Sequence, residues 1–162
     1  MSLTESNMLP LGTIAPPFIL PNVVTKNMES LGEHTGEKGT LIVFMCNHCP
    51  YVVHLLDHLV AFAKKNKQKR INTIAISSND VENYPSDHPK HMRALAIEKA
   101  FSFPYLYDEN QSVAKAYAAA CTPDFYLLDE KYKLVYRGRY DASRPGNNTP
   151  ITGEDLQKAV DL

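Results

Sequence analysis

The sequence predicts an α/β fold, a three-layer α/β/α sandwich with a mixed central sheet. Three observations indicate it. Short apolar segments without polar alternation, typical of strands covered on both faces, alternate with segments of helical apolar spacing. The later part of the chain changes to a hairpin and a final helix, which adds antiparallel strands to the parallel ones. With 162 residues and 44% hydrophobic content, the chain suits a single domain, 1–162, around one core.

The individual elements follow from the spacing of apolar residues, proline and glycine. Prolines break up the N-terminal segment, so only a short edge strand is expected there, and a glycine-containing loop or hairpin leads to the first central strand. The expected strands are 18–20, 40–45, 71–76, 103–107, 125–128 and 133–140. The expected helices run from after Cys49 to the basic run 64–70, over 90–101 and over 112–120, and a last helix is capped by Thr152 and Asp155.

Charge and composition exclude several classes of partner. Seventeen basic and eighteen acidic residues give a net charge of −1, so no global field attracts nucleic acid or an anionic membrane. The basic run 64–70 is interpreted as a solvated helix C-terminus rather than a nucleic-acid patch.

No stretch of the sequence is long and apolar enough for a membrane span, and residues 1–11 lack the pattern of a secretory signal. We expect a cytoplasmic location, or a periplasmic one if a signal peptide was removed.

Cys46 and Cys49 are the candidate catalytic residues. They form a Cys-x-x-Cys pair between the apolar strand 40–45 and the following helix. The unpaired N–H groups and positive partial charge of a helix N-terminus favour a thiolate over a thiol. We expect Cys46 to lie further out and act as the nucleophile, and half-buried Cys49 to resolve the mixed disulfide. His48 is expected to tune the pair by stabilising a thiolate; the alternative is that it faces solvent.

Metal binding is the main alternative to redox chemistry for this pair. Cys46 and Cys49 are spaced as half of a tetrahedral zinc site, which Cys121 and one histidine would have to complete. Two thiolates and a distant histidine would also suit Cu(I). His54 and His58 lie on one helix face, but surface decoration of that helix is the favoured interpretation. A c-type haem is excluded because proline, not histidine, follows the pair. We therefore expect redox chemistry without a cofactor.

Other polar residues are expected at the same edge of the sheet, because ligands gather beyond the carboxyl ends of parallel strands. Asn79 and Asp80 follow the strand 71–76 and are candidates for a substrate groove. Arg144 lies in the loop after the last hairpin strand, whose end returns to this edge if the strand is antiparallel. Asp141 and Arg144 either line the groove or pair to hold the loop, and we favour the second interpretation.

The motif Cys46-Asn47-His48-Cys49 on a strand-to-helix turn, with Thr122-Pro123 opening a later strand, resembles the thioredoxin superfamily. The resemblance implies that Pro123 is a cis proline lying against the disulfide, and that the backbone of Thr122 pairs with an extended substrate. It implies a protein or small-molecule disulfide as substrate and an external thiol as reductant. Cys121 would then lie near the pair as a candidate third thiol; the favoured alternative is a small buried hydrophobe.

More closely, the chain resembles the alkyl hydroperoxide reductase/thiol-specific antioxidant, or redoxin, branch. The matching segments are 44–51, 77–80, 121–125 and 140–147, which span nearly the whole chain. The branch implies antioxidant activity, so a thiol-dependent peroxidase with Cys49 attacking peroxide and Cys46 resolving is an alternative function. Peroxiredoxins need a proline and then a threonine before that cysteine, whereas this chain has Ile42 and Cys46 at those positions. We therefore expect disulfide exchange.

Overall fold

The central layer of the molecule is a five-stranded mixed sheet. The computed structural model describes residues 9–78, 81–119, 123–138, 140–141, 143, 147 and 149–161. The sheet contains β3 (Gly39–Phe44), β4 (Ile71–Ser77), β5 (Tyr105–Tyr107), β6 (Asp124–Leu128) and β7 (Leu134–Gly138), in the order β5-β4-β3-β6-β7. β3 runs parallel to β4, and β4 to β5, whereas β6 is antiparallel to both β3 and β7. The predicted mixed sheet is confirmed.

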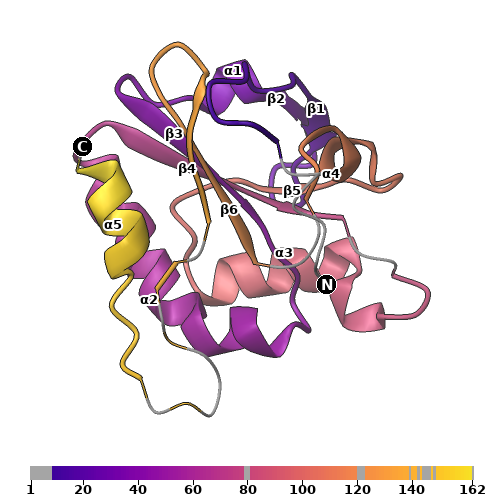
Figure 1. Cartoon of the computed structure of the whole chain (residues 1–162). Helices are drawn as coiled ribbons and strands as arrows, with labels where there is room; N and C mark the ends of the chain where they lie inside the picture. The colour runs from indigo at the N-terminus through magenta and orange to yellow at the C-terminus, as the bar shows by residue number, and fades with distance from the viewer. Residues whose placement is uncertain are drawn as a thin grey trace.

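Helices cover both faces of this sheet (Figure 1). One face carries α2 (Pro50–Lys67), α3 (Pro89–Glu98) and α5 (Glu154–Val160), which share a hydrophobic core. The other face carries α4 (Ser112–Ala116), α1 (Leu31–His34) and a hairpin of β1 (Ile19–Pro21) and β2 (Met28–Ser30), around a second core. The predicted three-layer arrangement is therefore confirmed. No described helix is both long and apolar enough to cross a membrane.

Strand β3 lies between the two cores, which explains its continuous apolar sequence. All six of its residues are buried. Leu41 and Val43 belong to the core beneath α2, whereas Ile42 and Phe44 belong to the core on the opposite face. Successive side chains of a strand point to opposite faces, so a strand covered on both sides needs an apolar residue at every position.

Three helix predictions need correction at their ends. The predicted helix 90–101 stops at Glu98, and Ala100 beyond it has a left-handed backbone conformation with φ of 52°. The predicted helix 112–120 stops at Ala116, because Ala118 adopts a left-handed backbone conformation with φ of 54° that ends a helix. The N-cap of α5 is Gly153, with φ of 65°, rather than Thr152. Asp141 decides this start, since its carboxylate accepts the backbone N–H groups of Thr152 and Gly153, both at 2.8 Å. A side chain from outside the helix therefore holds this end together with the Thr152 hydroxyl, which accepts the backbone N–H of Glu154 at 3.3 Å.

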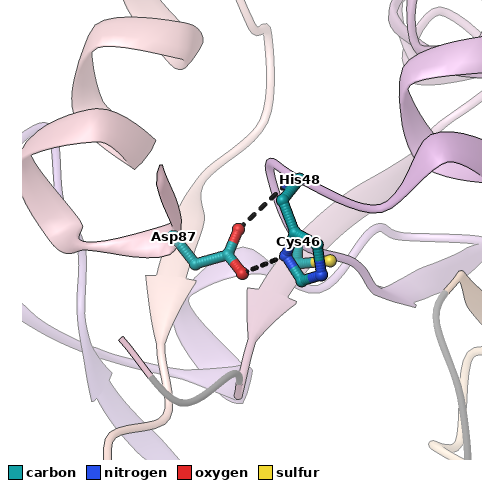
Figure 2. A group of neighbouring side chains, drawn as sticks. All are labelled: Cys46, His48 and Asp87. Atoms are coloured by element: carbon teal, nitrogen blue, oxygen red, sulfur yellow. Dashed lines mark hydrogen bonds and ion pairs between the residues drawn. The ribbon is translucent and has the colours of Figure 1, made fainter. Parts of the chain in front are cut away.

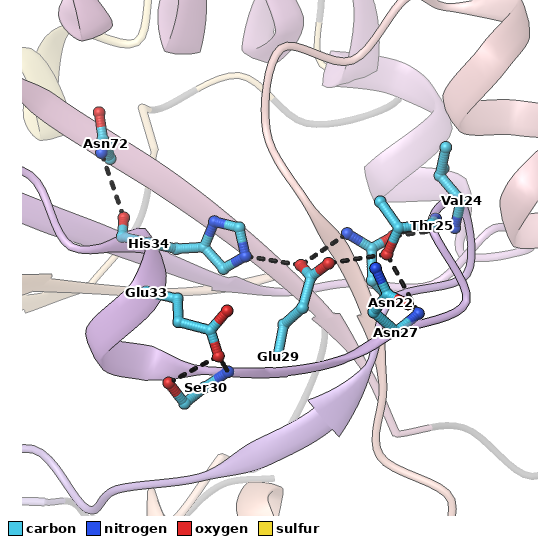
Figure 3. A network of polar contacts seen from close by, with 9 residues as sticks. All are labelled: Asn22, Val24, Thr25, Asn27, Glu29, Ser30, Glu33, His34 and Asn72. Carbon is cyan, nitrogen blue, oxygen red and sulfur yellow. Dashed lines mark hydrogen bonds and ion pairs between the residues drawn. The ribbon is translucent and has the colours of Figure 1, made fainter.

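The β1–β2 hairpin is held by a polar network centred on the buried carboxylate of Glu29 (Figure 3). This carboxylate accepts hydrogen bonds from the Asn22 amide at 2.8 Å and the Thr25 hydroxyl at 2.7 Å, and it contacts the His34 ring at 2.6 Å. Burial alone would raise the pKa of Glu29, but these three hydrogen bonds together outweigh it, and the pKa lies below its ordinary value of 4.5. The ionised carboxylate therefore stabilises the hairpin.

We predict that Glu29→Gln lowers the free energy of unfolding by about 1–3 kcal/mol at neutral pH, because hydrogen bonds to a charged acceptor are lost. A carboxyl with a depressed pKa stabilises the fold above its unfolded-state pKa, and this contribution is lost as pH falls through the folded-state value. The difference between wild type and variant should accordingly shrink below about pH 4 in urea unfolding. Glu98→Gln, at an exposed helix position, is the control. A difference that stays constant on acidification contradicts the prediction.

Candidate active site

The Cys-x-x-Cys pair lies at the carboxyl edge of the parallel strands, where it was predicted. The backbone N–H of Met45 still donates to Ile76 of β4 at 2.9 Å, so Cys46 is the first residue beyond the ladder. Cys49 is the N-cap of the 18-residue helix α2, with Pro50 at the first helical position. A proline is favourable there because it has no N–H to leave unpaired. The strand and the helix therefore fix the two ends of the turn 46–49.

The burial of Cys46 differs from the prediction, whereas that of Cys49 agrees with it. Cys46 is only 1% exposed, and Cys49 is half-buried. The prediction that Cys46 lies further out is wrong: α2 begins after Cys49, as predicted, but Cys46 directly follows Met45, which is still hydrogen-bonded to β4, and it is packed among the strand ends. Cys49 is consequently the cysteine beside the helix N-terminus, and Cys46 remains with the buried end of the sheet.

His48 is held by a buried carboxylate from a distant part of the chain. Its backbone N–H donates to Asp87 Oδ1 at 3.0 Å, and its ring Nδ1 is hydrogen-bonded to Asp87 Oδ2. Its ring also stacks on Tyr84, with 4.2 Å between ring centroids and 4° between planes. Figure 2 shows the imidazole between Asp87 and the region of Cys46. The alternative in which His48 simply faces solvent is therefore wrong.

Cys46, His48 and Asp87 form a compact group of three polar side chains. The Cys46 sulfur, a His48 ring nitrogen and an Asp87 carboxylate oxygen lie within 4.8 Å of one another. Asp87 is fully buried, so its charge lies in a region of low dielectric, where it acts strongly on both neighbours. Such a group can move a proton between the thiol and the imidazole, and it can also supply three ligand atoms to a metal ion.

Asp87 was missed by sequence analysis, which treated the connection 84–89 as polar and proline-broken. It ends the short 3₁₀-helix η2 (Pro85–Asp87), and its backbone N–H donates to Tyr84 at 2.9 Å. Pro85 and Pro89 restrict the backbone on both sides of the carboxylate. Two prolines flanking an acidic residue indicate a rigid connection, and this was the available signal.

Tyr105 of β5 holds the turn between the cysteines from a third strand. Its hydroxyl donates to the side-chain carbonyl of Asn47 at 2.9 Å. Burial raises the pKa of Tyr105 well above its ordinary value, and the nearby Cys46 and Asp87 raise it further. The hydroxyl therefore stays protonated and keeps its role as a donor to Asn47.

The remaining predicted site residues are only partly described. Pro123 is half-buried and immediately precedes Asp124, the β6 residue that pairs with Phe44. It therefore lies at the level of Met45, at the same sheet edge as Cys46. The other predicted residues lie outside the described residues, and their roles stay predictions: Asn79, Asp80, Cys121, Thr122 and Arg144.

His54 and His58 anchor a distant loop. His54 Nε2 is hydrogen-bonded to the Ser143 hydroxyl at 2.7 Å, and His58 Nδ1 to the Tyr140 hydroxyl. Both rings are half-buried, so surface decoration is an incomplete interpretation. Asp141 holds the same loop through backbone N–H groups, as an anchor rather than as a groove residue. Within the described part of the chain, neither histidine belongs to a cluster that could hold a metal.

Comparisons with known proteins identify the family of the chain and structures similar to it. The model of the AhpC/TSA family matches residues 11–137. A crystal structure of an uncharacterized conserved protein from Geobacillus kaustophilus is 51% identical, with a TM-score of 0.93 over 96% of this chain and 82% of that one. A hypothetical protein from Sinorhizobium meliloti 1021 is 42% identical, with a TM-score of 0.91 over 94% and 83%.

A more distant neighbour shares the fold alone. A putative thiol:disulfide interchange protein DsbE from Chlorobium tepidum is 18% identical, with a TM-score of 0.71 over 94% of this chain and 96% of that one. A search of curated proteins found no match. The family model covers most of the chain, and the sheet and helices agree with the thioredoxin-like neighbours. The chain therefore has a thioredoxin-like fold and belongs to the AhpC/TSA family.

Proposed function

We propose that this protein is a thiol-disulfide oxidoreductase that transfers two electrons from an external thiol to a disulfide substrate through Cys46 and Cys49. The observation that carries the proposal is the pair of half-buried His48 and buried Asp87 beside Cys46, at a turn that ends in a second, half-buried cysteine. A dithiol with a proton acceptor at hand has the parts that disulfide exchange requires.

We assign the first attack to Cys49, in place of the sequence-based assignment of Cys46. Cys49 is the N-cap of α2, where the positive end of the helix stabilises a thiolate. It is also the more exposed of the two sulfurs, so a substrate disulfide can reach it. Its thiolate attacks one sulfur of the substrate, forms a mixed disulfide and displaces the other substrate sulfur as a thiolate, which takes up a proton.

Cys46 then completes the reaction as the resolving thiol. Burial and the Asp87 charge within 4.8 Å both oppose ionisation of Cys46, so its proton needs an acceptor. His48 takes this proton, and Asp87 balances the charge of the imidazolium. The Cys46 thiolate attacks the Cys49 sulfur, the Cys46–Cys49 disulfide forms, and the second substrate thiolate leaves. The external thiol later reduces the pair.

The substrate groove is proposed to lie along the edge that holds Pro123. This residue immediately precedes β6, lies at the level of Met45 and is only partly buried. By resemblance to the superfamily, the backbone of Thr122 would pair with an extended substrate beside Cys49. A protein disulfide or a small disulfide fits this arrangement.

We predict different outcomes for serine variants of the three cysteines in an assay of insulin-disulfide reduction with an external thiol. Cys49→Ser should lose more than about 99% of activity, because the first attack is absent. Cys46→Ser should also lose turnover, but it should accumulate a mixed disulfide on Cys49 that mass spectrometry detects. Cys121→Ser is the matched control and should keep full activity.

The same variants separate the two orders of attack. A mixed disulfide on Cys46 in the Cys49→Ser variant, with none on Cys49 in the Cys46→Ser variant, contradicts the order proposed here. Full reductase activity in the Cys46→Ser variant contradicts the dithiol mechanism itself.

A thiol-dependent peroxidase is the second candidate function, favoured by the half-exposed Cys49 at a helix N-terminus and by membership of the AhpC/TSA family. Here Cys49 would attack peroxide, form a sulfenic acid and release water, after which Cys46 would resolve it as a disulfide. Peroxide consumption measured beside insulin reduction distinguishes the two functions. Efficient peroxide turnover with no reduction of insulin would replace the main proposal.

We predict that Asp87→Asn lowers the rate of insulin reduction about tenfold to a hundredfold, because the imidazolium formed at His48 loses its balancing charge. The mixed disulfide on Cys49 should persist longer in this variant, which a quench experiment measures. Asp108→Asn is the control, since Asp108 is an equally buried carboxylate that accepts backbone N–H groups of α4. Equal rate losses in both variants would assign Asp87 a purely structural role.

A zinc or copper carrier is the non-enzymatic alternative, and Cys46, His48 and Asp87 could supply ligand atoms. We predict that protein purified without a chelator contains well under one metal ion per chain, because the described cluster offers only three ligand groups where a closed zinc site uses four. Elemental analysis by mass spectrometry measures this content. One zinc or copper ion per chain, absent in the Cys46→Ser variant, would support the carrier instead.

A further inference from the structure

A cavity whose lining contains neither cysteine lies between the turn that follows β1 and the start of α3. Its volume is about 460 Å³, within the range of pockets that hold small molecules. The edge strand β5 forms its floor, because Asn22 bridges Leu106, and the N–H of Val23 donates to Tyr105 at 3.1 Å. β1, β5 and α3 can be followed in Figure 1. The cavity is lined by Pro21, Asn22, Val23, Lys26, Pro89, Lys90, Arg93 and Tyr107.

The lining combines an apolar wall with a cationic rim. Val23 is buried and Tyr107 is half-buried, so they offer apolar and aromatic surface. Lys26, Lys90 and Arg93 are exposed around them. No acidic residue is among the lining residues, and in the described segments none of the three cations forms an ion pair. The cavity therefore carries an uncompensated positive charge.

Both sides of the cavity are fixed before any ligand arrives. Lys90 and Arg93 lie three residues apart on α3, so their side chains share one helix face. On the other side, the Asn22 side chain accepts the N–H of Val24 at 2.8 Å and donates to the Glu29 carboxylate (Figure 3). The N–H of Lys26 donates to the carbonyl of Asn22 at 2.8 Å. A preformed site loses little entropy on binding.

We propose that this cavity binds a small organic anion, with its acidic group among Lys26, Lys90 and Arg93 and its apolar or aromatic body against Val23 and Tyr107. The site goes beyond the proposed redox function, because neither cysteine contributes to it. Three cations around one cavity attract a carboxylate, sulfonate or phosphate. An apolar body adds affinity by burying its surface on the wall.

The test uses two fluorescent probes that differ in one group. Anilinonaphthalene sulfonate carries the acidic group and the aromatic body, and N-phenylnaphthylamine has the same body without the charge. The full chain, its double variant Lys90→Ala/Arg93→Ala and the control Lys64→Ala/Lys65→Ala are titrated with each probe. Lys64 and Lys65 are exposed on α2 and are not among the residues that line the cavity, and their removal changes the net charge equally.

We expect wild type and the control to bind the anionic probe with one-to-one stoichiometry and the double variant to bind it about tenfold more weakly. The neutral probe should bind weakly and equally to all three proteins. Amide chemical shifts should move at 22–26 and 90–93 on addition of the anionic probe. The proposal is overturned by equal affinity of the double variant, by a neutral probe that binds as tightly as the anionic one, or by shift changes confined to other segments.

Discussion

The buried carboxylate of Asp87 is the constraint on which the candidate site depends. A fully buried charge costs several kcal/mol unless hydrogen bonds compensate it. Both of its oxygens are satisfied by a single residue, through the backbone N–H and the ring of His48. This pairing fixes the turn between the cysteines against η2, a segment that follows β4 in the sequence. Removing either partner would leave the other uncompensated, so the two segments are ordered together.

The mixed sheet brings the other parts of the site to the same place. β3 and β4 end at this edge, whereas β6 begins there, since it runs in the opposite direction. A strand end therefore delivers Cys46, and a strand start delivers Pro123 beside it. Tyr105 reaches Asn47 from β5, two strands away. Residues that are far apart in sequence thus meet because strand direction reverses between β3 and β6.

Sequence analysis identified what depends on local pattern. Short stretches of sequence reveal the buried strands, the helix after Cys49 and the Cys46–Cys49 pair. The mixed sheet was inferred from these elements. Sequence analysis did not identify Asp87, because an aspartate in a polar connection has the same local pattern whether it is solvated or buried. Its partner His48 lies 39 residues away in the sequence. The prediction for Cys46 was wrong for a related reason: its burial depends on the neighbouring strands and segments that pack around it, not on the local pattern. The contacts of His54 and His58 likewise span more than eighty residues.

The burial of Cys46 bears on the order of events at the pair. A sulfur with 1% exposure cannot be the first to meet a protein disulfide, but it suits an intramolecular second step, in which the mixed disulfide is already held nearby. Attack on a peroxide would follow the same order, so the order alone does not separate the two substrates. What separates them is the surroundings of Cys49. By resemblance to the peroxiredoxins, peroxide reduction needs a threonine hydroxyl where this chain has Cys46. This difference supports the proposal of disulfide exchange.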